Sequence, residues 1–394
     1  MDRIHDFARF PTGLRYPAVA DLGRKAQRVL PRFAWDYLNG GLGAEACLHR
    51  NLAAFRDYPL IPLRLHSKDP VDPAVEVFGR RQALPIGISP VGYPNLFRHH
   101  GERHLAQAAS RAGALFTQST FSTETMECIA RHAGDDYWFQ LYPSKDIDVT
   151  LDMVDRARAA GAQALVVTID VPIHSKRERD WRNGLSLSLR PSMRMIRQAT
   201  LRPQWSLTML AKGFPRLRVL EPYIPAAMQG AAAGYDHIFD LMDSAFCLAD
   251  LKRIRERWPG PLIIKGVLDA GLARQLFDLG ADAIQVSNHG GRQLDAAPAS
   301  LHCVRRIVEV AGGKPVFVDG GIRSGSDVLC ALHAGATYCF AGRPFYYSVA
   351  ALGAKAGAQH IFALFQDEIQ RTMIQLGTPS IAALRPDTDV RDTA

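Results

Sequence analysis

From about residue 84 onward, short apolar runs alternate with longer amphipathic segments. The strand-like runs are Leu84–Ser89, Ala114–Gln118, Tyr137–Leu141, Ala164–Ile169, Leu262–Lys265, Ala283–Ser287, Val316–Asp319 and Tyr338–Ala341. Between most of them lie helix-like segments such as Gly101–Ala112, Asp146–Ala160, Asp269–Leu279 and Ser324–Ala334. Strands that alternate with helices form parallel sheets, and eight such strands favour a closed (β/α)8 barrel over an open doubly wound sheet. We therefore predict an α/β protein with the TIM-barrel architecture.

The 394 residues could hold two domains, but one barrel with insertions fits the length equally well. We predict a single domain over 1–394, with an N-terminal helical cap over 1–80 and a barrel over 84–360. The cap is interrupted at Asn39–Gly43, where glycines cluster. A long stretch without strand character follows the fourth strand, and we interpret 181–235 as an inserted loop of the kind that carries function.

Composition and cysteine usage exclude several classes of protein. The chain is 47% hydrophobic and 22% charged, as ordinary globular proteins are. Its six cysteines are scattered, with no C-x-x-C pair, so we expect no disulfide framework, no metal site and a reducing, cytoplasmic location. The first ten residues interleave charges and lack the apolar core of a signal peptide. No run of eighteen apolar residues is present, so we expect no membrane-spanning helix.

The net charge of +8 is concentrated in one segment. Residues 181–220 contain no Asp or Glu and eight basic residues, Arg182, Arg190, Arg194, Arg197, Arg202, Lys212, Arg216 and Arg218, and the remainder of the chain balances 39 basic against 39 acidic residues. Apolar side chains such as Trp205 and Phe214 lie between these charges, a composition that suits an anionic membrane surface. A solvated loop would show the same excess charge. We expect no nucleic-acid partner, because no recognition motif accompanies the charge.

Two glycine-containing turns follow the last two predicted strands. Asp319-Gly320-Gly321-Ile322-Arg323 follows the seventh, and Gly342-Arg343-Pro344 follows the eighth. In (β/α)8 barrels these two loops commonly bind a phosphate through backbone N–H groups and a helix N-terminus. The pattern indicates a ligand that carries a phosphate, although two plain turns would use glycine as well.

The sixth strand ends in the segment Ser287-Asn288-His289-Gly290-Gly291-Arg292. Catalytic residues of barrels lie at the carboxyl ends of the strands, where His289 is expected. A histidine titrates near neutral pH and can act as a general base, and an arginine offers a planar fork for a carboxylate. This pair predicts a substrate that is an acid with an abstractable proton.

Further polar residues follow other strands. Asp170 ends the fourth strand and is placed to orient the His289 imidazole, and Arg177 is a second candidate for the carboxylate. Gln140 and Tyr142 are two residues apart on the third strand and point the same way. Lys265 ends the fifth strand, where it could form a Schiff base or stabilise negative charge on an electron-accepting ring.

Together these motifs resemble the FMN-dependent α-hydroxy-acid dehydrogenases and oxidases, the family of glycolate oxidase, L-lactate dehydrogenase and mandelate dehydrogenase. The resemblance runs from about Leu30 to the C-terminus. It rests on Ser287–Asp295 and recurs in Trp35-Asp36-Tyr37, Trp138-Phe139-Gln140-Leu141-Tyr142, Thr168-Ile169-Asp170-Val171-Pro172, Ile264-Lys265-Gly266-Val267 and Asp319-Gly320-Gly321-Ile322-Arg323. Arg202-Pro203-Gln204-Trp205-Ser206-Leu207 and Gln375-Leu376-Gly377 look most similar to the membrane-associated mandelate and lactate dehydrogenases.

The resemblance implies a role for each matching residue. His289 would be the base, supported by Asp170, and Lys265 would stabilise the reduced flavin. The substrate would be bound by Tyr37, Tyr142, Arg177 and Arg292, together with His289. FMN would be held by Pro90, Val91, Gly92, Ser119, Gln140, Thr168, Lys265, Ser287, Asp319, Gly321, Arg323, Gly342 and Arg343.

The resemblance further implies an FMN-dependent (S)-2-hydroxy-acid dehydrogenase that acts on a lactate- or mandelate-like acid. It implies a quinone-type electron acceptor, a peripheral position on the cytoplasmic face of the inner membrane, and a homo-oligomer, a tetramer in the family. The alternative is an oxidase that passes electrons to oxygen and forms hydrogen peroxide. A flavin-free Schiff-base lyase and a non-catalytic phosphate-binding or membrane scaffold are more distant alternatives. The chain departs from the family pattern at Gly41–Glu45, at Phe121 and at Gly92.

Overall fold

A computed structural model describes residues 12–63, 70–173, 175–185, 192–228, 232–242 and 246–384. Eight parallel strands close into a barrel, in the order β10-β3-β4-β5-β6-β7-β8-β9. Their bounds are β3 (Ile86–Ile88), β4 (Phe116–Ser119), β5 (Tyr137–Leu141), β6 (Ala164–Thr168), β7 (Leu262–Val267), β8 (Ala283–Val286), β9 (Val316–Asp319) and β10 (Tyr338–Ala341). The predicted (β/α)8 fold is confirmed, and each predicted strand lies within a few residues of an observed one.

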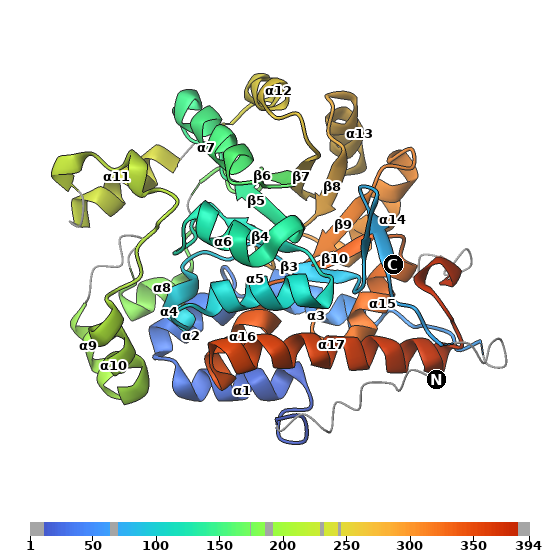
Figure 1. The fold of residues 1–394 in the computed structure, drawn as a ribbon, viewed down its shortest axis with the longest axis horizontal. Coiled ribbons are helices and arrows are strands. Elements are labelled where there is room, and N and C mark those ends of the chain that lie inside the picture. The colour runs from blue at the N-terminus through green and yellow to red at the C-terminus, as the bar shows by residue number, and fades with distance from the viewer. Residues whose placement is uncertain are drawn as a thin grey trace.

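Helices surround the barrel and connect its strands (Figure 1). The connecting helices are α4 (Pro94–Phe97), α5 (Gly101–Ala112), α6 (Met126–Ala133), α7 (Ile147–Ala159), α12 (Leu248–Arg257), α13 (Ala270–Asp278), α14 (Ser300–Val310) and α15 (Gly325–His333). After β10 the chain forms α16 (Arg343–Leu352) and the long helix α17 (Ala354–Leu376). Among the described residues, no helix is both long enough and apolar enough to cross a bilayer.

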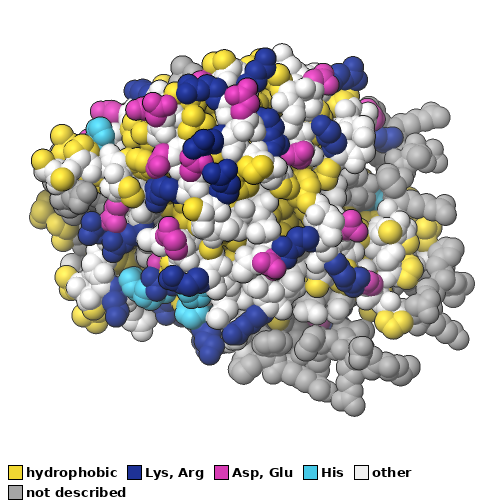
Figure 2. All heavy atoms as spheres, turned by 45° about the horizontal axis from the view of Figure 1, so that its top comes forward, with side chains coloured by type: hydrophobic (Ala, Val, Ile, Leu, Met, Phe, Trp, Pro, Cys, Tyr) yellow, Lys and Arg dark blue, Asp and Glu magenta, His cyan; other side chains and the backbone are white. Residues whose placement is uncertain are grey.

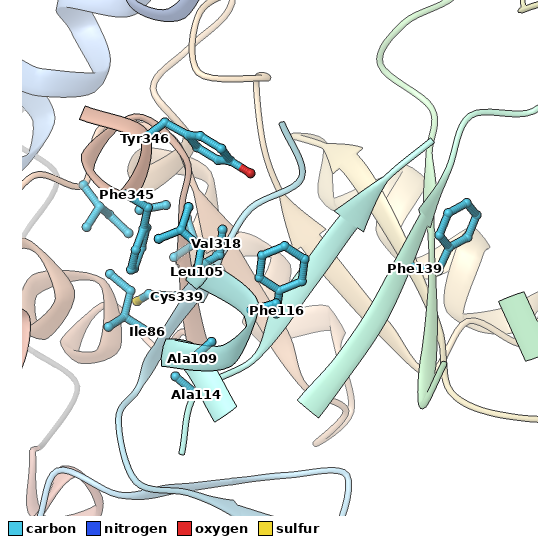
Figure 3. Packing of buried hydrophobic residues seen from close by; sticks show 14 of the residues in the cluster. Ile86, Leu105, Ala109, Ala114, Phe116, Phe139, Val318, Cys339, Phe345 and Tyr346 are labelled. Carbon is cyan, nitrogen blue, oxygen red and sulfur yellow. The ribbon is translucent and has the colours of Figure 1, made fainter. Parts of the chain in front are cut away.

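The core lies between the strands and the helices that cover them. In Figure 3, Leu105 and Ala109 of α5 face the strand residues Ile86, Val318 and Cys339, all of which are buried. Phe345 and Tyr346 of α16 pack in the same region. The strand residues alternate, so that Phe317 and Phe340 fill the barrel interior with Trp138 while their neighbours face the helices.

The N-terminal region contains helices and one hairpin. The helices are α1 (Val19–Val29), α2 (Arg32–Asn39) and α3 (Ala46–Arg56). In addition to the helices of the predicted cap, β1 (Val75–Val77) and β2 (Arg80–Gln82) form an antiparallel hairpin that the sequence did not predict. Phe78, in the turn of this hairpin, packs on Trp138 and Phe317 of the barrel interior. Its apolar turn therefore covers one end of the barrel, which a polar surface helix could not do.

The segment between β6 and β7 is not an irregular loop. Its described part contains α8 (Glu178–Asn183), α9 (Met193–Thr200), α10 (Pro203–Lys212) and α11 (Ala232–Met242). In Figure 1, α9, α10 and α11 project to the left of the barrel, beyond the layer of helices that covers the strands. The helices α9 and α10 pack against each other and α9 packs against α2, so the insertion is joined to the N-terminal helices. We call residues 178–242 the inserted segment.

Candidate active site

A cavity of about 1080 Å³ lies at the carboxyl ends of the barrel strands. Most of the residues predicted from the sequence line it, namely Tyr37, Pro90, Val91, Gly92, Ser119, Tyr142, Thr168, Arg177, Lys265, His289, Arg292, Asp319, Gly321, Arg323, Gly342 and Arg343. Gln140, Asp170 and Ser287 do not line the cavity but neighbour residues that do, because Asp170 hydrogen-bonds to His289, Ser287 to Lys265, and Gln140 pairs with Ser119 between β5 and β4. One cavity therefore collects side chains from the N-terminal helices, the barrel and the inserted segment.

His289 is held between an acid and a phenol. Its Nδ1 lies 3.0 Å from Oδ1 of Asp170, and its Nε2 lies 3.2 Å from the hydroxyl of Tyr142. Burial by itself raises the pKa of Asp170, but the charges of His289 and Lys265 outweigh burial and lower that pKa, so Asp170 stays ionised. An ionised Asp170 fixes the imidazole orientation and leaves Nε2 directed at the cavity.

Two backbone features place this pair. His289 adopts a left-handed conformation with φ of 58°, which is uncommon for a residue other than glycine and is often found at functional sites. Gly266 provides the space for Asp170, because a Cβ at Gly266 would lie 2.6 Å from the Cβ of Asp170. The backbone conformation also requires glycine, because the φ of Gly266 is 101°, which other residues rarely adopt.

Lys265 belongs to a buried polar chain at the base of the cavity. Its Nζ donates to Oγ of Ser287 at 2.7 Å and lies 3.2 Å from Oδ2 of Asp319. Oδ2 of Asp319 also accepts a hydrogen bond from Gln285. The Lys265 side chain is thus paired with a carboxylate at the cavity wall. This arrangement fits stabilisation of negative charge better than Schiff-base formation, which requires a neutral amine.

Tyr37 lies against two guanidinium groups. The guanidinium carbons of Arg177 and Arg292 lie 4.8 Å and 5.3 Å from the centre of its ring. Arg177 pairs with Asp180, with Nε and Oδ2 3.2 Å apart, and Arg292 donates to the carbonyl of Gly40 at 2.7 Å. Burial raises the pKa of Tyr37, so its hydroxyl remains protonated and can donate a hydrogen bond. Two cations and a phenol thus line the part of the cavity where a carboxylate would be bound.

Buried polar atoms without partners lie at or near the cavity wall. Among the described residues, both amide atoms of Gln140 and Oγ1 of Thr168 are buried with no hydrogen-bond partner. Such groups are costly unless a ligand satisfies them. An amide offers a donor and an acceptor side by side, which suits the heteroatom edge of a flavin ring. Ser119 ends the neighbouring strand β4 and lines the cavity as well.

The two glycine-containing turns line the cavity as well. At Gly321, whose φ is 99°, a Cβ would lie 2.5 Å from the carbonyl oxygen of Asn51, so only glycine fits. Gly342 caps the N-terminus of α16, where unpaired N–H groups favour an anion. Arg323 lines the cavity beside this helix start and supplies a further positive charge.

Arg343 makes backbone contacts that the sequence-based expectation did not include. Its guanidinium donates to the carbonyls of Leu38, Gly40 and Gly290, which occupies three of its five N–H groups. Burial lowers the pKa of Arg343 to about 10. Its main contacts therefore join the end of α2 to the His289 loop, and fewer N–H groups than expected are left for a phosphate.

Sequence reasoning missed several residues around the cavity. Asn51 and Asn288 exchange two amide hydrogen bonds of 2.8 Å and thereby hold the His289 loop against α3. Asn288 adjoins His289 in the sequence, whereas nothing in the sequence signals Asn51. Phe239 of α11 stacks on Phe121 at 5.9 Å, and both line an apolar part of the cavity with Met242. The partner of Phe121 lies more than a hundred residues away, so no local pattern could reveal it.

The inserted segment exposes apolar side chains among its basic ones. Met193, Leu201, Leu207 and Leu210 are all more than 60% exposed, and Ile196 and Phe214 are also exposed. Figure 2 shows hydrophobic and basic side chains beside one another along its left margin, the side from which α9, α10 and α11 project in Figure 1. Arg216 and Arg218 both pair with Glu221, so part of the predicted charge excess is neutralised within the segment. Arg190 lies outside the described residues.

No group of three or more His, Cys, Asp or Glu side chains in the described ranges is arranged to hold a metal ion.

Comparisons with known proteins support the same chemistry. A family model described as FMN-dependent dehydrogenase matches residues 26–391. An L-lactate dehydrogenase of Caulobacter vibrioides is 37% identical over 373 residues, covering 93% of this chain and 96% of the relative. A 4-hydroxymandelate oxidase of Amycolatopsis orientalis is 38% identical and covers 94% of this chain and 98% of its own. A solved structure, that of the monotopic membrane protein (S)-mandelate dehydrogenase, matches with a TM-score of 0.89 at 34% identity, covering 94% and 98% of the two chains.

Proposed function

The chain belongs to the FMN-dependent dehydrogenase family, and on that premise we propose that it oxidises an (S)-2-hydroxy acid to the 2-oxo acid and delivers the electrons to a quinone-type acceptor. As a member of this family it is an oxidoreductase that acts on the CH–OH group of 2-hydroxy acids with FMN as cofactor. The single observation that carries the proposal is the His289 arrangement, a base between Asp170 and a cavity whose other wall presents two guanidinium groups.

The residues present fit FMN. Gln140 and Thr168 offer unpartnered polar atoms that would hydrogen-bond to the isoalloxazine edge, Lys265 would stabilise negative charge on the ring, and the Gly321 and Gly342 turns would offer N–H groups to the phosphate. Pro90, Val91 and Gly92 line the same cavity and would cover a face of the ring. When bound, FMN accepts the two electrons that leave the substrate's Cα.

The protein side of the reaction is proton transfer and positioning. His289 would accept a proton from the substrate at Nε2, and Asp170 would stabilise the imidazolium through Nδ1. Tyr142, whose hydroxyl lies 3.2 Å from Nε2, would donate a hydrogen bond to the hydroxy acid beside the base. Arg177 and Arg292 would bind the carboxylate, with Tyr37 between them.

Space beside these groups favours a side chain larger than methyl. A Cβ at Gly92 would lie 3.2 Å from both the hydroxyl of Tyr37 and the Cβ of Phe121, so glycine leaves room there that alanine would fill. Beyond Phe121 the cavity wall is apolar and includes Phe239, Met242 and Phe246. An aromatic, mandelate-like acid fits this wall better than lactate does, because apolar lining stabilises an aromatic side chain.

The inserted segment supports a peripheral position at a membrane. Its exposed Met193, Leu207 and Leu210 lie among basic residues, as in segments that bind anionic lipid surfaces. A protein bound at a membrane surface would have access to a quinone dissolved in the bilayer. We also propose that the protein is cytoplasmic and that it forms a homo-oligomer. The 4-hydroxymandelate oxidase relative keeps oxygen as the alternative acceptor.

The test begins with the purified protein, which should be yellow and should contain one FMN per chain. Anaerobic addition of (S)-mandelate or L-lactate should bleach the flavin absorbance, with the lower KM for mandelate. Rapid mixing of the reduced protein with a short-chain quinone or with air-saturated buffer then compares the two acceptors. Bleaching by neither acid would refute the proposed reaction, and reoxidation by oxygen faster than by quinone would replace the dehydrogenase with an oxidase.

A further inference from the structure

Helix α2 carries Tyr37 but lacks a local N-terminal cap. The residue at its N-cap position is Pro31, and no side chain from that position bonds to the first helical turn. The first N–H groups of a helix have no partner within the helix, and a side chain that accepts from one of them stabilises the helix. A helix of eight residues with no cap of its own is marginal, so α2 depends on contacts from elsewhere in the chain.

The inserted segment supplies the missing cap. Oε1 of Gln198, on α9, accepts a hydrogen bond of 2.8 Å from the backbone N–H of Phe33, in the first turn of α2. The amide nitrogen of the same side chain donates to Oδ1 of Asn183 at 3.0 Å. Both atoms of the Gln198 amide are thus used, one on α2 and one on α8.

Asn183 continues this chain of bonds to the residue beside Tyr37. Its Nδ2 donates to Oδ2 of Asp36 at 2.7 Å, and the Asn183 side chain is buried. Asp36 immediately precedes Tyr37 on α2. Arg179 of α8 lies near Asp36 as well and pairs with Glu45, whose other oxygen accepts the N–H of Gly41 beyond the end of α2.

Two further residues of the inserted segment contact α2 and the residues around it. Arg202 donates to the carbonyl of Leu30 at 3.1 Å, just before α2 begins. Trp205 of α10 donates to the carbonyl of Leu96 at 2.9 Å, and its ring meets Phe33 edge-on at 5.5 Å. The next residue after Leu96 is Phe97, whose ring stacks on Tyr37 at 6.0 Å. The inserted segment therefore contacts α2 at its start, at Asp36 and through the stacking partner of Tyr37.

We propose that Asn183 and Gln198 are positioning residues for substrate binding, because they hold the Tyr37 edge of α2 at a fixed distance from Arg177, which immediately precedes α8. The proposal rests on the proposed function, since it takes Tyr37 and Arg177 as contacts of the hydroxy acid. If so, the inserted segment shapes the substrate site in addition to binding the membrane surface. Proton transfer by His289 is set by the barrel and does not depend on this pair.

The experiment compares Gln198→Ala and Asn183→Ala with Thr200→Ala, an exposed position on the same helix α9 that bonds only to its own helix. In the FMN-loaded enzyme, KM for the hydroxy acid and the Kd of the 2-oxo acid, read from the flavin absorbance, should rise about three- to tenfold in the first two variants. The kcat should fall by less than about twofold, because the base is untouched. The pH profile of kcat should stay that of the parent.

Hydrogen exchange provides a readout that needs no turnover. The N–H of Phe33 should lose protection in Gln198→Ala and keep it in Gln198→Glu, because a carboxylate still accepts that hydrogen bond. In Gln198→Glu the bond to Asn183 is lost, so an intermediate KM should result. This variant keeps the proposal testable if the alanine variants fold poorly.

Two results would overturn the proposal. One is loss of Phe33 protection with KM and Kd equal to those of Thr200→Ala, which would make the contacts structural only. The other is a fall in kcat with unchanged KM. Failure of the proposed function is a separate result, because it would appear in the parent protein as absence of flavin bleaching before any variant is made.

Discussion

His289 and Arg177 reach one cavity from regions that are ordered in different ways. His289 follows β8, a strand that is hydrogen-bonded to neighbours on both sides in a closed barrel. Arg177 immediately precedes α8, the first helix of the inserted segment, which is joined to α2 by side-chain contacts such as those of Asn183 and Gln198. The backbone ladder of a barrel fixes a strand end within small limits, whereas a few side-chain bonds fix a helix less tightly.

This difference separates two tasks. Groups that must align within a fraction of an ångström for proton transfer, His289 and Asp170, lie on the barrel. The groups proposed to bind the substrate lie outside the barrel, Tyr37 on α2 and Arg177 immediately before α8. We therefore expect barrel variants to lower the rate of the chemical step, and variants of the inserted segment to lower affinity for substrate or membrane.

The largest effect is expected at His289. His289→Asn should keep FMN bound but slow flavin reduction by about 10²–10⁴-fold, the usual contribution of a general base. Asparagine is preferable to alanine because it tolerates the left-handed backbone at this position. Stopped-flow absorbance measures the rate, and His302→Asn, at an exposed position on α14, is the control. Reduction at the parent rate would remove His289 as the base.

The next largest effect is expected at Gly266, whose backbone position sets the distance between Asp170 and His289. Gly266→Ala should push Asp170 away from His289 and lower the rate of reduction by about 10²-fold, as a displacement near 1 Å can. Gly161→Ala is a matched control, because its φ is also positive and no atom lies within 4 Å of the added Cβ. Equal rates in the two variants would show that backbone strain, and not Asp170, matters.

Arg292 lies between the two regions, since it comes from the β8 loop and bonds to Gly40 beyond α2. Arg292→Lys should raise KM about tenfold, because an ammonium cannot pair with a carboxylate in two places while also donating to Gly40. Steady-state kinetics with a dye acceptor provides the measurement, with Arg305→Lys, in an exposed ion pair on α14, as the control. A change confined to kcat would place the carboxylate elsewhere.

The smallest effect concerns the surface of the inserted segment. Arg197→Gln should weaken binding to vesicles that contain anionic lipid about fivefold at low salt, since a basic residue near such a surface contributes about 1 kcal/mol. Turnover with a soluble dye should be unchanged. Vesicle flotation at two salt concentrations measures the binding, because screening should reduce the difference between variant and parent. Failure of the parent protein to bind anionic vesicles would contradict the proposed membrane binding.

Sequence reasoning succeeded where pattern and neighbourhood along the chain determine structure. The strand Val316–Asp319 was predicted with its observed bounds because it is a short β-branched run followed by glycines. His289 and Lys265 line one cavity and Asp170 contacts His289 there, because strand ends of a parallel barrel must meet on one face. Those inferences needed only the fold.

Other features depend on contacts that the sequence does not encode locally. Gln198 caps Phe33 across 165 residues, and Asn51 pairs with Asn288 across 237. Ordinary polar side chains in surface-like helices gave no sign of these partners. The carbonyl contacts of Arg343 were missed for a related reason, since a motif predicts that an arginine faces a ligand but not which backbone atoms compete for it.

The Gln198 contact has a practical consequence for making a version of the enzyme with a less apolar surface. Deleting the inserted segment would remove its exposed apolar side chains, but it would also remove the cap of α2. The shortened protein should therefore aggregate less but bind substrate more weakly. Exchanging exposed side chains such as Met193, Leu207 and Leu210 for polar ones would change the surface while the helices stay in place. Engineering of this segment should therefore replace its exposed apolar side chains and keep all of its helices.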